Sequence, residues 1–471
     1  MQSPIETDYL VVGAGTAGMA ITDALLKHSD ASITLLERRH APGGHWIDAY
    51  PFVRLHQPSA FYGVDSVQLG QDAVDRGGLN AGFYEQASAN ELRAYFNHVM
   101  QEHFLPTGRV RFFPCSSYVS GEHDWHRFVS ALTGDVQEIR VRRKLVDTGF
   151  LEGQIPATSR PPFDVDDDVA CVPAGDITRL AKSYQTFVVI GAGKTAMDTC
   201  VWLLTNGVSA SAIRWVKPRE GWWLNRRYHQ PHTLLPDFYF AVGLQFRAMA
   251  KAESVDDLFL RLEADGFFLR VDTSVMPTMV RGAIMSEAEL ALLRQIKDVV
   301  RLGQVRRIQR HSMRLDQGDV DTPSNALHIH CAAVGLARPA TRPIFEAGRL
   351  TVQPTSWGFA SHQFALLGAV EAIIDSDEEK NRLCRPIQYW DKPTDYLTAY
   401  MALLAGERAR AAHPALAKWL RGSRLNPLGR LDEHRDDPRV VNTKALLKEI
   451  GPAAVANVSK LLAAQATAPG R

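Results

Sequence analysis

Two segments of the chain share one pattern of apolar and polar positions: a short apolar run, a turn rich in glycine, and a helix with an apolar face. In the first segment the run DYLVV at 8–12 precedes GAGTAG at 13–18, and apolar residues then recur at helical spacing from Met19 to Leu26. A second run of strand type, ITLLE, ends at Glu37. This succession, with an acidic residue about 20 positions after the turn, is the dinucleotide-binding fingerprint.

The residue types of this first segment suit a pyrophosphate and a ribose. Gly13 permits a tight turn, Gly15 lets the backbone approach the pyrophosphate, and Gly18 lets the helix pack closely on the strand. The helix N-terminus offers unpaired N–H groups and a partial positive charge to the phosphates. Glu37 is placed to accept hydrogen bonds from ribose hydroxyls. We therefore expect residues 13–37 to bind a dinucleotide.

The same pattern returns in the middle of the chain. TFVVI at 186–190 is a second buried strand, and GAGKTA follows it with Gly191 and Gly193 at the turn positions. Lys194 and Thr195 come next, where the following helix begins, and are predicted to contact the phosphates of a second cofactor.

Alignment of the two segments predicts which nucleotide the second one binds. Matching the second strands, Ile33 with Ile213, places Lys217 at the position of Glu37. A carboxylate there repels the 2′-phosphate of NADPH, whereas Lys217, assisted by Arg219, attracts it. NADPH is therefore expected rather than NADH. The alternatives are that these cations cap a sheet edge or that one of them faces the other cofactor.

Two dinucleotide folds in one chain predict transfer of a hydride from NADPH to FAD. The expected fold class is α/β, with two nested Rossmann-like domains arranged as in glutathione reductase, a helical insertion and a helical C-terminus. The predicted FAD-binding domain is discontinuous and comprises residues 1–180 and 325–390. The NAD(P)H-binding domain covers 181–324, with a helical, substrate-covering insertion at about 244–320, and helices follow at 391–471.

Motifs after the first fold carry a resemblance to a known family. RRHAPGGHW contains a GGxW pattern, and DAYPFVRLHQPSAFYGV contains a YPxxR-like stretch. With both, the chain resembles the group B flavin-dependent monooxygenases: the flavin-containing, Baeyer–Villiger and N-hydroxylating enzymes. The resemblance implies that Arg38, Gly44, His45 and Trp46 contact FAD. The alternative is an ordinary Gly-Gly turn beside a core tryptophan.

The same resemblance implies two catalytic residues. His56 and Arg54 lie in the YPxxR-like stretch, where His56 would shuttle a proton or stabilise an oxygenated flavin and Arg54 would face the flavin. Alternatively, His56 is a structural histidine and Arg54 forms an ion pair. The segment VPAGDITRLAKSYQ at 172–185 departs from the family, because it lacks the histidine of the usual FxGxxxHxxxY fingerprint.

Composition narrows the remaining classes of function. The net charge is +1, from 53 basic and 52 acidic residues, which does not favour a nucleic-acid partner. No apolar run reaches the roughly 18 residues needed to cross a bilayer, and the acidic N-terminus does not resemble a signal peptide, so we expect a cytoplasmic protein without membrane contact. The five cysteines form no CxxC pair, which predicts neither a metal site nor a redox dithiol.

The expected activity follows from the paired folds and the family resemblance. The resemblance implies that a small organic substrate receives one atom of dioxygen through a C4a-peroxyflavin, with FAD and NADPH as cofactors. Two alternatives remain: a flavin reductase or dehydrogenase without oxygen transfer, and a non-catalytic, nucleotide-binding redox sensor.

Overall fold

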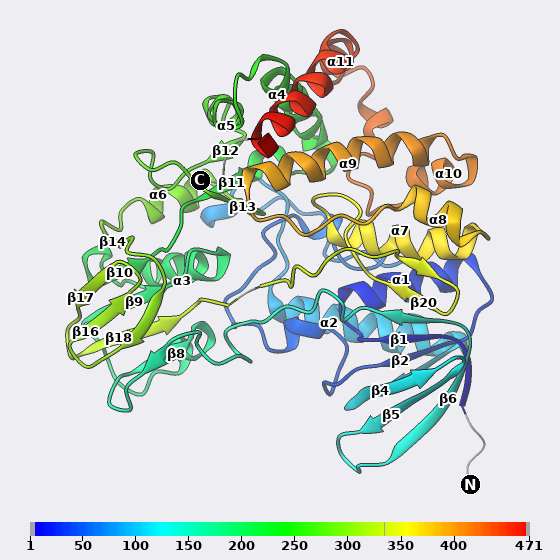
Figure 1. Cartoon of the computed structure of the whole chain (residues 1–471), viewed down its shortest axis with the longest axis horizontal. Coiled ribbons are helices and arrows are strands. Elements are labelled where there is room, and N and C mark those ends of the chain that lie inside the picture. Colours follow the sequence, from blue (N-terminus) through cyan, green and yellow to red (C-terminus); the bar gives the residue numbers. More distant parts are fainter. Residues whose placement is uncertain (1–4, 334, 468–471) are drawn as a thin grey trace.

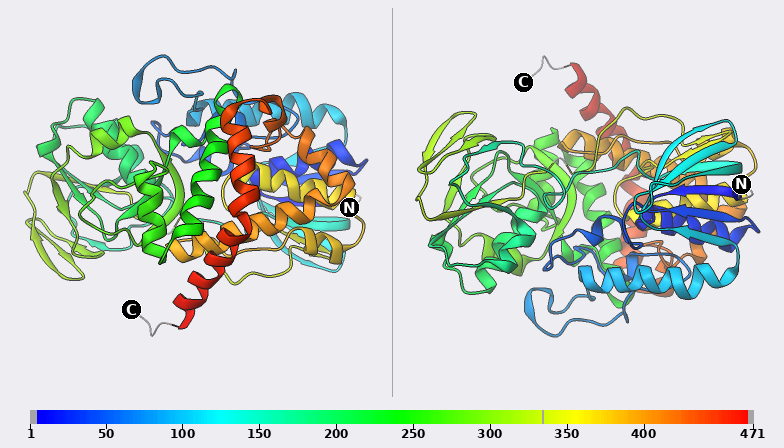
Figure 2. Two further views of the ribbon diagram at one scale, coloured as in Figure 1. Left: turned by 90° about the horizontal axis from the view of Figure 1, so that it is seen from above. Right: turned by 90° about the horizontal axis from the view of Figure 1, so that it is seen from below.

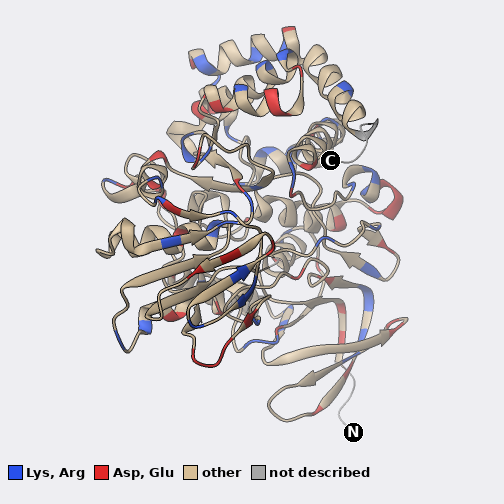
Figure 3. Ribbon diagram, turned by 60° about the vertical axis from the view of Figure 1, so that its left-hand side comes forward, with Lys and Arg blue, Asp and Glu red and all other residues tan. Residues whose placement is uncertain are grey.

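The structure, a computed structural model, describes residues 5–333 and 335–467. Two sheets, one mixed and one parallel, form the two ends of the molecule, and a set of helices covers the region above and between them (Figure 1). Views from above and below show the same division, with the long C-terminal helix crossing between the two ends (Figure 2). Basic and acidic residues are interspersed over the ribbon (Figure 3).

The first sheet contains the first glycine turn. Its central strand β1 (Ile5–Val12) leads into helix α1 (Thr16–His28), and Val12 lies beside Leu36 of β2, so Glu37 follows directly at the sheet edge. The strand order is β19-β20-β6-β1-β2-β3, with a β4–β5 hairpin attached to β6. The other bounds are β2 (Ile33–Leu36), β3 (Val110–Phe113), β4 (Ser116–Glu122), β5 (Trp125–Ser130), β6 (Val136–Asp147), β19 (Phe345–Glu346) and β20 (Arg349–Thr351).

The second sheet repeats the arrangement around the second glycine turn. Its strands pair in parallel in the order β14-β10-β9-β18-β8. Val216 lies beside Ile190, so Lys217 occupies the position of Glu37, as the sequence alignment predicts. The bounds are β8 (Cys171–Pro173), β9 (Thr186–Ile190), α3 (Lys194–Thr205), β10 (Ile213–Val216), β14 (Asp298–Val300) and β18 (Ala326–His330). The predicted α/β class with two Rossmann-like units is confirmed.

Two predicted boundaries are wrong. The strand at 325–339 was expected to return to the first domain, yet β18 pairs with β9 and β8 in the second sheet. The chain re-enters the first sheet only at β20, which pairs with β6. The β8 strand, expected within the first domain, also belongs to the second sheet. A buried apolar strand fits either sheet by periodicity, and long-range pairing decides between them.

The insertion is helical only in its first part. Helices α4 (Leu235–Lys251) and α5 (Val255–Ala264) are followed by a three-stranded sheet of order β12-β11-β13, by α6 (Glu287–Leu293), and by a sheet of order β17-β16-β15-β7. The predicted helical insertion at 244–320 is therefore wrong beyond α5. The strands are β7 (Asp164–Val165), β11 (Gly221–Asn225), β12 (Phe268–Leu269), β13 (Met279–Met285), β15 (Val305–Ile308), β16 (Ser312–Leu315) and β17 (Gly318–Asp321).

The C-terminal part is helical as far as the structure describes it. Helix α11 (Pro438–Thr467) packs along α4, which ties the end of the chain to the insertion (Figure 2). The remaining helices are α2 (Ala89–His98), α7 (Ala360–Ile373), α8 (Asp377–Leu383), α9 (Pro393–Ala411) and α10 (Pro414–Gly422). Among the described residues, no helix has the length and apolar character needed to cross a membrane.

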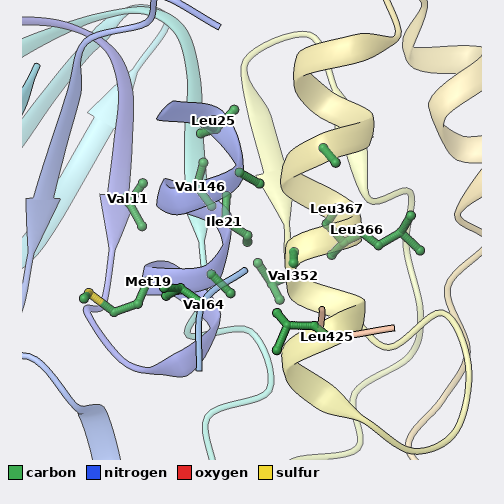
Figure 4. Packing of buried hydrophobic residues seen from close by; sticks show 14 of the residues in the cluster. Val11, Met19, Ile21, Leu25, Val64, Val146, Val352, Leu366, Leu367 and Leu425 are labelled. Atoms are coloured by element: carbon green, nitrogen blue, oxygen red, sulfur yellow. The ribbon is translucent and has the colours of Figure 1, made fainter. Parts of the chain in front are cut away.

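The core of the first domain lies between α1 and α7. Ile21 of α1 and Leu366 of α7 are fully buried, and Figure 4 shows them together with Val11 and Val146 of the sheet. Gly368 permits this packing, because a Cβ there would lie 2.8 Å from the Cβ of Ala24. The core thus holds α1, and with it the glycine turn, against the sheet.

The close packing at Gly18 predicts the first experimental result. A Cβ on Gly18 would overlap the carbonyl oxygen of Gly13, so Gly18→Ala must displace the turn from the helix. We expect a loss of about 2 kcal/mol in the free energy of unfolding, measured by urea titration. The matched control is Gly348→Ala, where a Cβ meets no heavy atom within 4 Å. Equal stability of the two variants would contradict this account of the turn.

Candidate functional site

The first glycine turn is a backbone cradle at the tip of β1. Gly13 has φ +101°, a conformation that favours glycine. Gly44 lies directly against Gly15, and a Cβ on Gly44 would come within 2.8 Å of the Cα of Gly15. Helix α1 begins after Gly15 without a side-chain cap. The N–H groups of its first turn are therefore available to a phosphate, which fits the diphosphate of FAD.

Glu37 is buried at the edge of this cradle. Its Oε2 accepts a hydrogen bond from the N–H of Ala14 at 2.9 Å, and its Oε1 accepts one from the N–H of Arg39 at 3.0 Å. Each carboxylate oxygen has a second lone pair for a ribose hydroxyl. Arg38 instead points to solvent and pairs with Glu152. The structure thus fits Glu37 to a nucleotide and places Arg38 outside the cradle.

The GGxW segment connects the cradle to the rest of the first domain. Trp46 is buried and donates its indole N–H to Tyr62 Oη at 2.8 Å. Tyr62 in turn shares a 2.6 Å hydrogen bond with Thr16 Oγ1, in the first turn of α1. The ring of His45 is exposed beside Trp46, with ring centroids 4.7 Å apart. Trp46 therefore stabilises the first turn of α1 through Tyr62, while His45 is open to a ligand.

The second glycine turn, like the first, leads into a helix that begins without a side-chain cap. Gly191 has φ +146° and lies against the carbonyl of Cys331. A Cβ on Gly193 would meet no heavy atom of the described chain within 4 Å, and α3 begins at Lys194 without a side-chain cap. The turn therefore leaves space and unpaired N–H groups for the phosphates of a second nucleotide. Thr195, one residue further, is partly exposed in this first helical turn.

Lys217 does not lie free for a 2′-phosphate, which corrects the prediction made for it. Its side chain is 2% exposed, and its ammonium group bonds Glu220 at 2.5 Å. Burial lowers the pKa of Lys217, in spite of the neighbouring carboxylate. Arg301 holds the other oxygen of Glu220 at 2.8 Å. A buried cation is stable only when it is paired, and Glu220, three residues away in sequence, supplies the partner.

Arg219 and Arg54 are also engaged in ion pairs. Arg219 makes a bidentate contact with Asp391 at 2.7 and 2.8 Å. Arg54 is largely exposed, donates to the carbonyl of Gln86 at 2.8 Å, and lies 4.0 Å from Glu91. The ion-pair alternative for Arg54 is therefore the one its contacts fit, and its predicted catalytic role is not supported.

A tyrosine of the first domain contacts the helix that follows the second glycine turn. Tyr50, in the YPxxR-like stretch, donates its hydroxyl to Asp198 Oδ2 of α3 at 2.7 Å. Asp198 also pairs with Lys194 one turn earlier. The segment that follows the first nucleotide cradle thus meets the helix that begins at the second one. Two bound cofactors would approach each other here.

His56 completes this interdomain cluster, together with charged residues of the insertion. Lys194 Nζ bonds Glu289 Oε1 at 3.2 Å, and Arg226 bonds Glu289 Oε2 at 2.6 Å. Burial and the positive charges of Lys194 and Arg226 lower the pKa of His56 to about 3. We use the name interdomain cluster for these six residues: Tyr50, His56, Lys194, Asp198, Arg226 and Glu289.

The charges of the cluster have consistent physical causes. Burial acts to lower the pKa of Lys194, but Asp198 and Glu289 outweigh it and raise the pKa. Burial likewise acts to raise the pKa of Glu289, yet Lys194 and Arg226 bring it down to about 2. Both residues are therefore charged at neutral pH.

His56, like Tyr50, is an uncharged member of the cluster. Its Nδ1 accepts a 3.3 Å hydrogen bond from the N–H of Ile284, so its proton is assigned to Nε2. A neutral imidazole with a protonated Nε2 donates a hydrogen bond but cannot act as a strong acid near neutral pH. This geometry suits stabilisation of an electron-rich atom rather than the proton shuttle.

Sequence inspection missed four members of the cluster. Asp198 stands four residues after Lys194, an i,i+4 charge spacing that can be recognised on a helix. Tyr50 lies inside the YPxxR-like stretch, which was noted for Arg54 and His56, whereas Arg226 belongs to none of the motifs described above. Glu289 forms a capping box with Ser286, a pattern that predicts only a helix start. Among the described residues, no group of three or more His, Cys, Asp and Glu side chains is arranged to hold a metal ion.

Comparison with known proteins agrees with the first fold. The model of the family of NAD(P)-binding Rossmann-like domains matches residues 11–56, which confirms the predicted dinucleotide fold around Gly13. Uncharacterized proteins of Mycobacterium bovis and of two strains of Mycobacterium tuberculosis are each 41% identical over 428 residues, covering 91% of this chain and 79% of the relative.

The solved structures with partial similarity include two monooxygenases and a reductase. An NADP⁺-bound cyclohexanone monooxygenase from Rhodococcus sp. Phi1 matches with 14% identity and TM-score 0.43, covering 69% of this chain and 70% of that one. A flavin-containing monooxygenase from Stenotrophomonas maltophilia has 16% identity and TM-score 0.40, with coverages of 74% and 86%. A bacillithiol disulfide reductase from Bacillus cereus has 10% identity and TM-score 0.44, with coverages of 78% and 98%.

The depressed pKa of His56 predicts a dependence of stability on pH. The unfolded chain binds a proton at this histidine below about pH 6.5, whereas the folded protein resists protonation until about pH 3. Its contribution is therefore complete above about pH 6.5 and is lost as the pH falls. Between about pH 7.5 and about pH 5.5, we expect the wild type to lose about 1 kcal/mol more stability than His56→Gln.

Urea titrations at both pH values measure this difference. His311→Gln, at an exposed position, is the matched control and should follow the wild type. If His56→Gln also follows the wild type, His56 is not held neutral by the interdomain cluster.

Proposed function

The chain belongs to the same family as these mycobacterial proteins, and we propose that it is an oxidoreductase that binds FAD in its first dinucleotide fold and NADPH in its second. The observation that carries the proposal is the contact between Tyr50 and Asp198 at 2.7 Å. It joins the segment following the FAD cradle to the helix that starts at the second phosphate-binding turn. Two nucleotides bound at these turns would therefore converge on the interdomain cluster.

The chain's own residues have defined roles in this proposal. The turn from Gly13 to Gly15, with Gly44 against it, holds the diphosphate of FAD through backbone N–H groups, and Glu37 orients the ribose. Gly193 leaves the equivalent space for NADPH. Bound FAD would supply acceptance of a hydride from NADPH and onward transfer of electrons.

We further propose that the electron acceptor is dioxygen and that one oxygen atom enters a small organic substrate. The GGxW and YPxxR-like motifs support this monooxygenase activity through the family they resemble. All five cysteines are free, so no cysteine pair among the described residues offers a dithiol acceptor instead. Within the site, His56 would donate its Nε2–H to the oxygen that accumulates charge, and the ion-paired Lys194 would contribute to the positive potential there.

The visible spectrum of the purified protein and the fate of oxygen test this proposal. We expect a yellow protein with flavin absorbance, which NADPH bleaches under anaerobic conditions because a hydride reaches the flavin. With labelled dioxygen, the product should carry one labelled atom. Complete transfer of the electrons to dioxygen with release of hydrogen peroxide, and no labelled product from any substrate tried, would favour the flavin reductase alternative. A colourless protein that does not bind added FAD would overturn the proposal altogether.

The pairing of Lys217 predicts how the preference between NADPH and NADH can be changed. Glu220→Gln removes the carboxylate that neutralises the buried Lys217 and the partly exposed Arg301, so the positive potential at this sheet edge rises and Arg301 can attract a 2′-phosphate. We expect the ratio of kcat/KM for NADPH to that for NADH to rise about tenfold, which corresponds to about 1.4 kcal/mol. Steady-state kinetics with both donors measures the ratio.

Two controls accompany this variant. Glu379→Gln removes a surface carboxylate that is paired with Arg382 and should leave the ratio unchanged. The melting temperature shows whether an unpaired, buried Lys217 destabilises the fold. A folded Glu220→Gln enzyme with an unaltered ratio would show that the charge of Lys217 and Arg301 does not determine the preference for NADPH.

A further inference from the structure

A bulge in β13 lies beside the interdomain cluster. Trp222 of β11 pairs with Val280, but Leu224 pairs with Ile284, so one residue of β11 faces three residues of β13. Gly282 at the centre of this bulge has φ +72°. Ile284, at its end, donates its N–H to His56. Bulges of this kind turn side chains toward functional sites.

Three arginines converge on one carboxylate at this bulge. Asp391 receives the bidentate contact of Arg219 and a 2.8 Å hydrogen bond from Arg281 Nε. Arg338 lies 3.9 Å from Asp391 and bonds Asp395 at 2.7 Å. Three guanidinium groups thus face two carboxylates, which leaves one excess positive charge. All three arginine side chains are about one third exposed, at 34%, 38% and 34%.

Two buried indole groups beside the same bulge have no hydrogen-bond partner in the described chain. Trp357 and Trp390 are 9% and 5% exposed, and the Nε1 atom of each is without an acceptor. A Cβ on Gly282 would lie 3.3 Å from Trp390 Nε1 and 3.8 Å from the ring of Trp357. An unpaired buried donor costs about 1–3 kcal/mol, so these N–H groups indicate a missing acceptor.

A cavity of about 520 Å³ adjoins Arg338, one of the three arginines. Arg338 and Asp395 border it, and the apolar part of its wall consists of Ala340, Pro386, Ile387 and Ala399. Arg338 uses its Nε and NH2 groups for Tyr389 and Asp395, while NH1 lies beyond hydrogen-bond distance of Asp391. The cavity therefore combines an available guanidinium donor with space for an apolar group.

We propose that the β13 bulge is a binding site for an oxyanion, a carboxylate or a phosphate, on a ligand with an apolar body, and that Asp391 occupies the place of this oxyanion until the ligand displaces it. The unpaired groups at the site are all donors, so the site selects an acceptor-rich group. The inference rests on the proposed function, because it gives that enzyme's ligand a chemical class. The oxyanion belongs either to an organic-acid substrate or to the dinucleotide.

Two variants with opposite expected effects test the proposal. Asp391→Asn removes the competing charge, so we expect phenylacetate to bind about tenfold more tightly. Arg281→Gln removes one cation, so we expect binding about tenfold weaker. Isothermal titration calorimetry on the full-length protein, with adenosine 2′,5′-bisphosphate as the second probe, measures both effects. Asp316→Asn, on a distant ion pair with Arg306, is the matched control and should bind like the wild type.

Each outcome has a defined meaning. Tighter binding of phenylacetate to Asp391→Asn supports an organic-acid ligand, and tighter binding of the bisphosphate supports the dinucleotide as the source of the oxyanion. If Asp391→Asn weakens both or changes neither, Asp391 is a structural ion-pair partner and the proposal fails. Should Asp391→Asn not fold, unchanged affinities in folded Arg281→Gln would overturn the proposal. Calorimetry does not require flavin turnover, so a colourless protein would refute the proposed function without deciding this test.

Discussion

The close approach of backbone to backbone around the first glycine turn is the constraint on which the rest of the structure depends. Gly18 lets α1 sit directly behind the turn, and Gly44 lies against Gly15 without a side chain between them. This contact determines where the chain goes next. The segment after Gly44 is linked to the first turn of α1 through Trp46 and its hydrogen bond to Tyr62. It then brings Tyr50 and His56 to the second fold. The close contact between Gly15 and Gly44 therefore directs the chain toward the interdomain cluster.

Ion pairs between cations and carboxylates of the same chain recur in the segments that follow the second glycine turn. Lys194, Lys217 and Arg219 all lie in segments whose sequence suggests phosphate contacts, and each has a carboxylate partner in the structure. A cation that leaves water loses several kcal/mol of hydration free energy, which a nearby carboxylate restores. The partners are also anions, so a phosphate that reaches these cations must compete with them. The carboxylates thus control how strongly each cation attracts a ligand.

The fold by itself leaves the reaction open, because one fold can support many chemistries and the side chains at the site decide which of them occurs. In this chain a neutral histidine, an ion-paired lysine and a bulged strand flanked by arginines and tryptophans lie near the contact between the two dinucleotide folds. The family relationship extends the question to the mycobacterial relatives, whose chains share most of this length.

The sequence alone determined the two dinucleotide turns, the helical C-terminus, and the alignment that gives Lys217 in the second fold the position of Glu37 in the first. Each of these depends on residues close together along the chain. Only the tertiary structure decided that β18 belongs to the second sheet, that strands follow α5, and that Arg54 faces solvent. It also decided that Lys217 is buried on Glu220 and that His56 accepts a hydrogen bond from Ile284. Local periodicity records whether a residue prefers burial, but not which distant strand or charge will cover it.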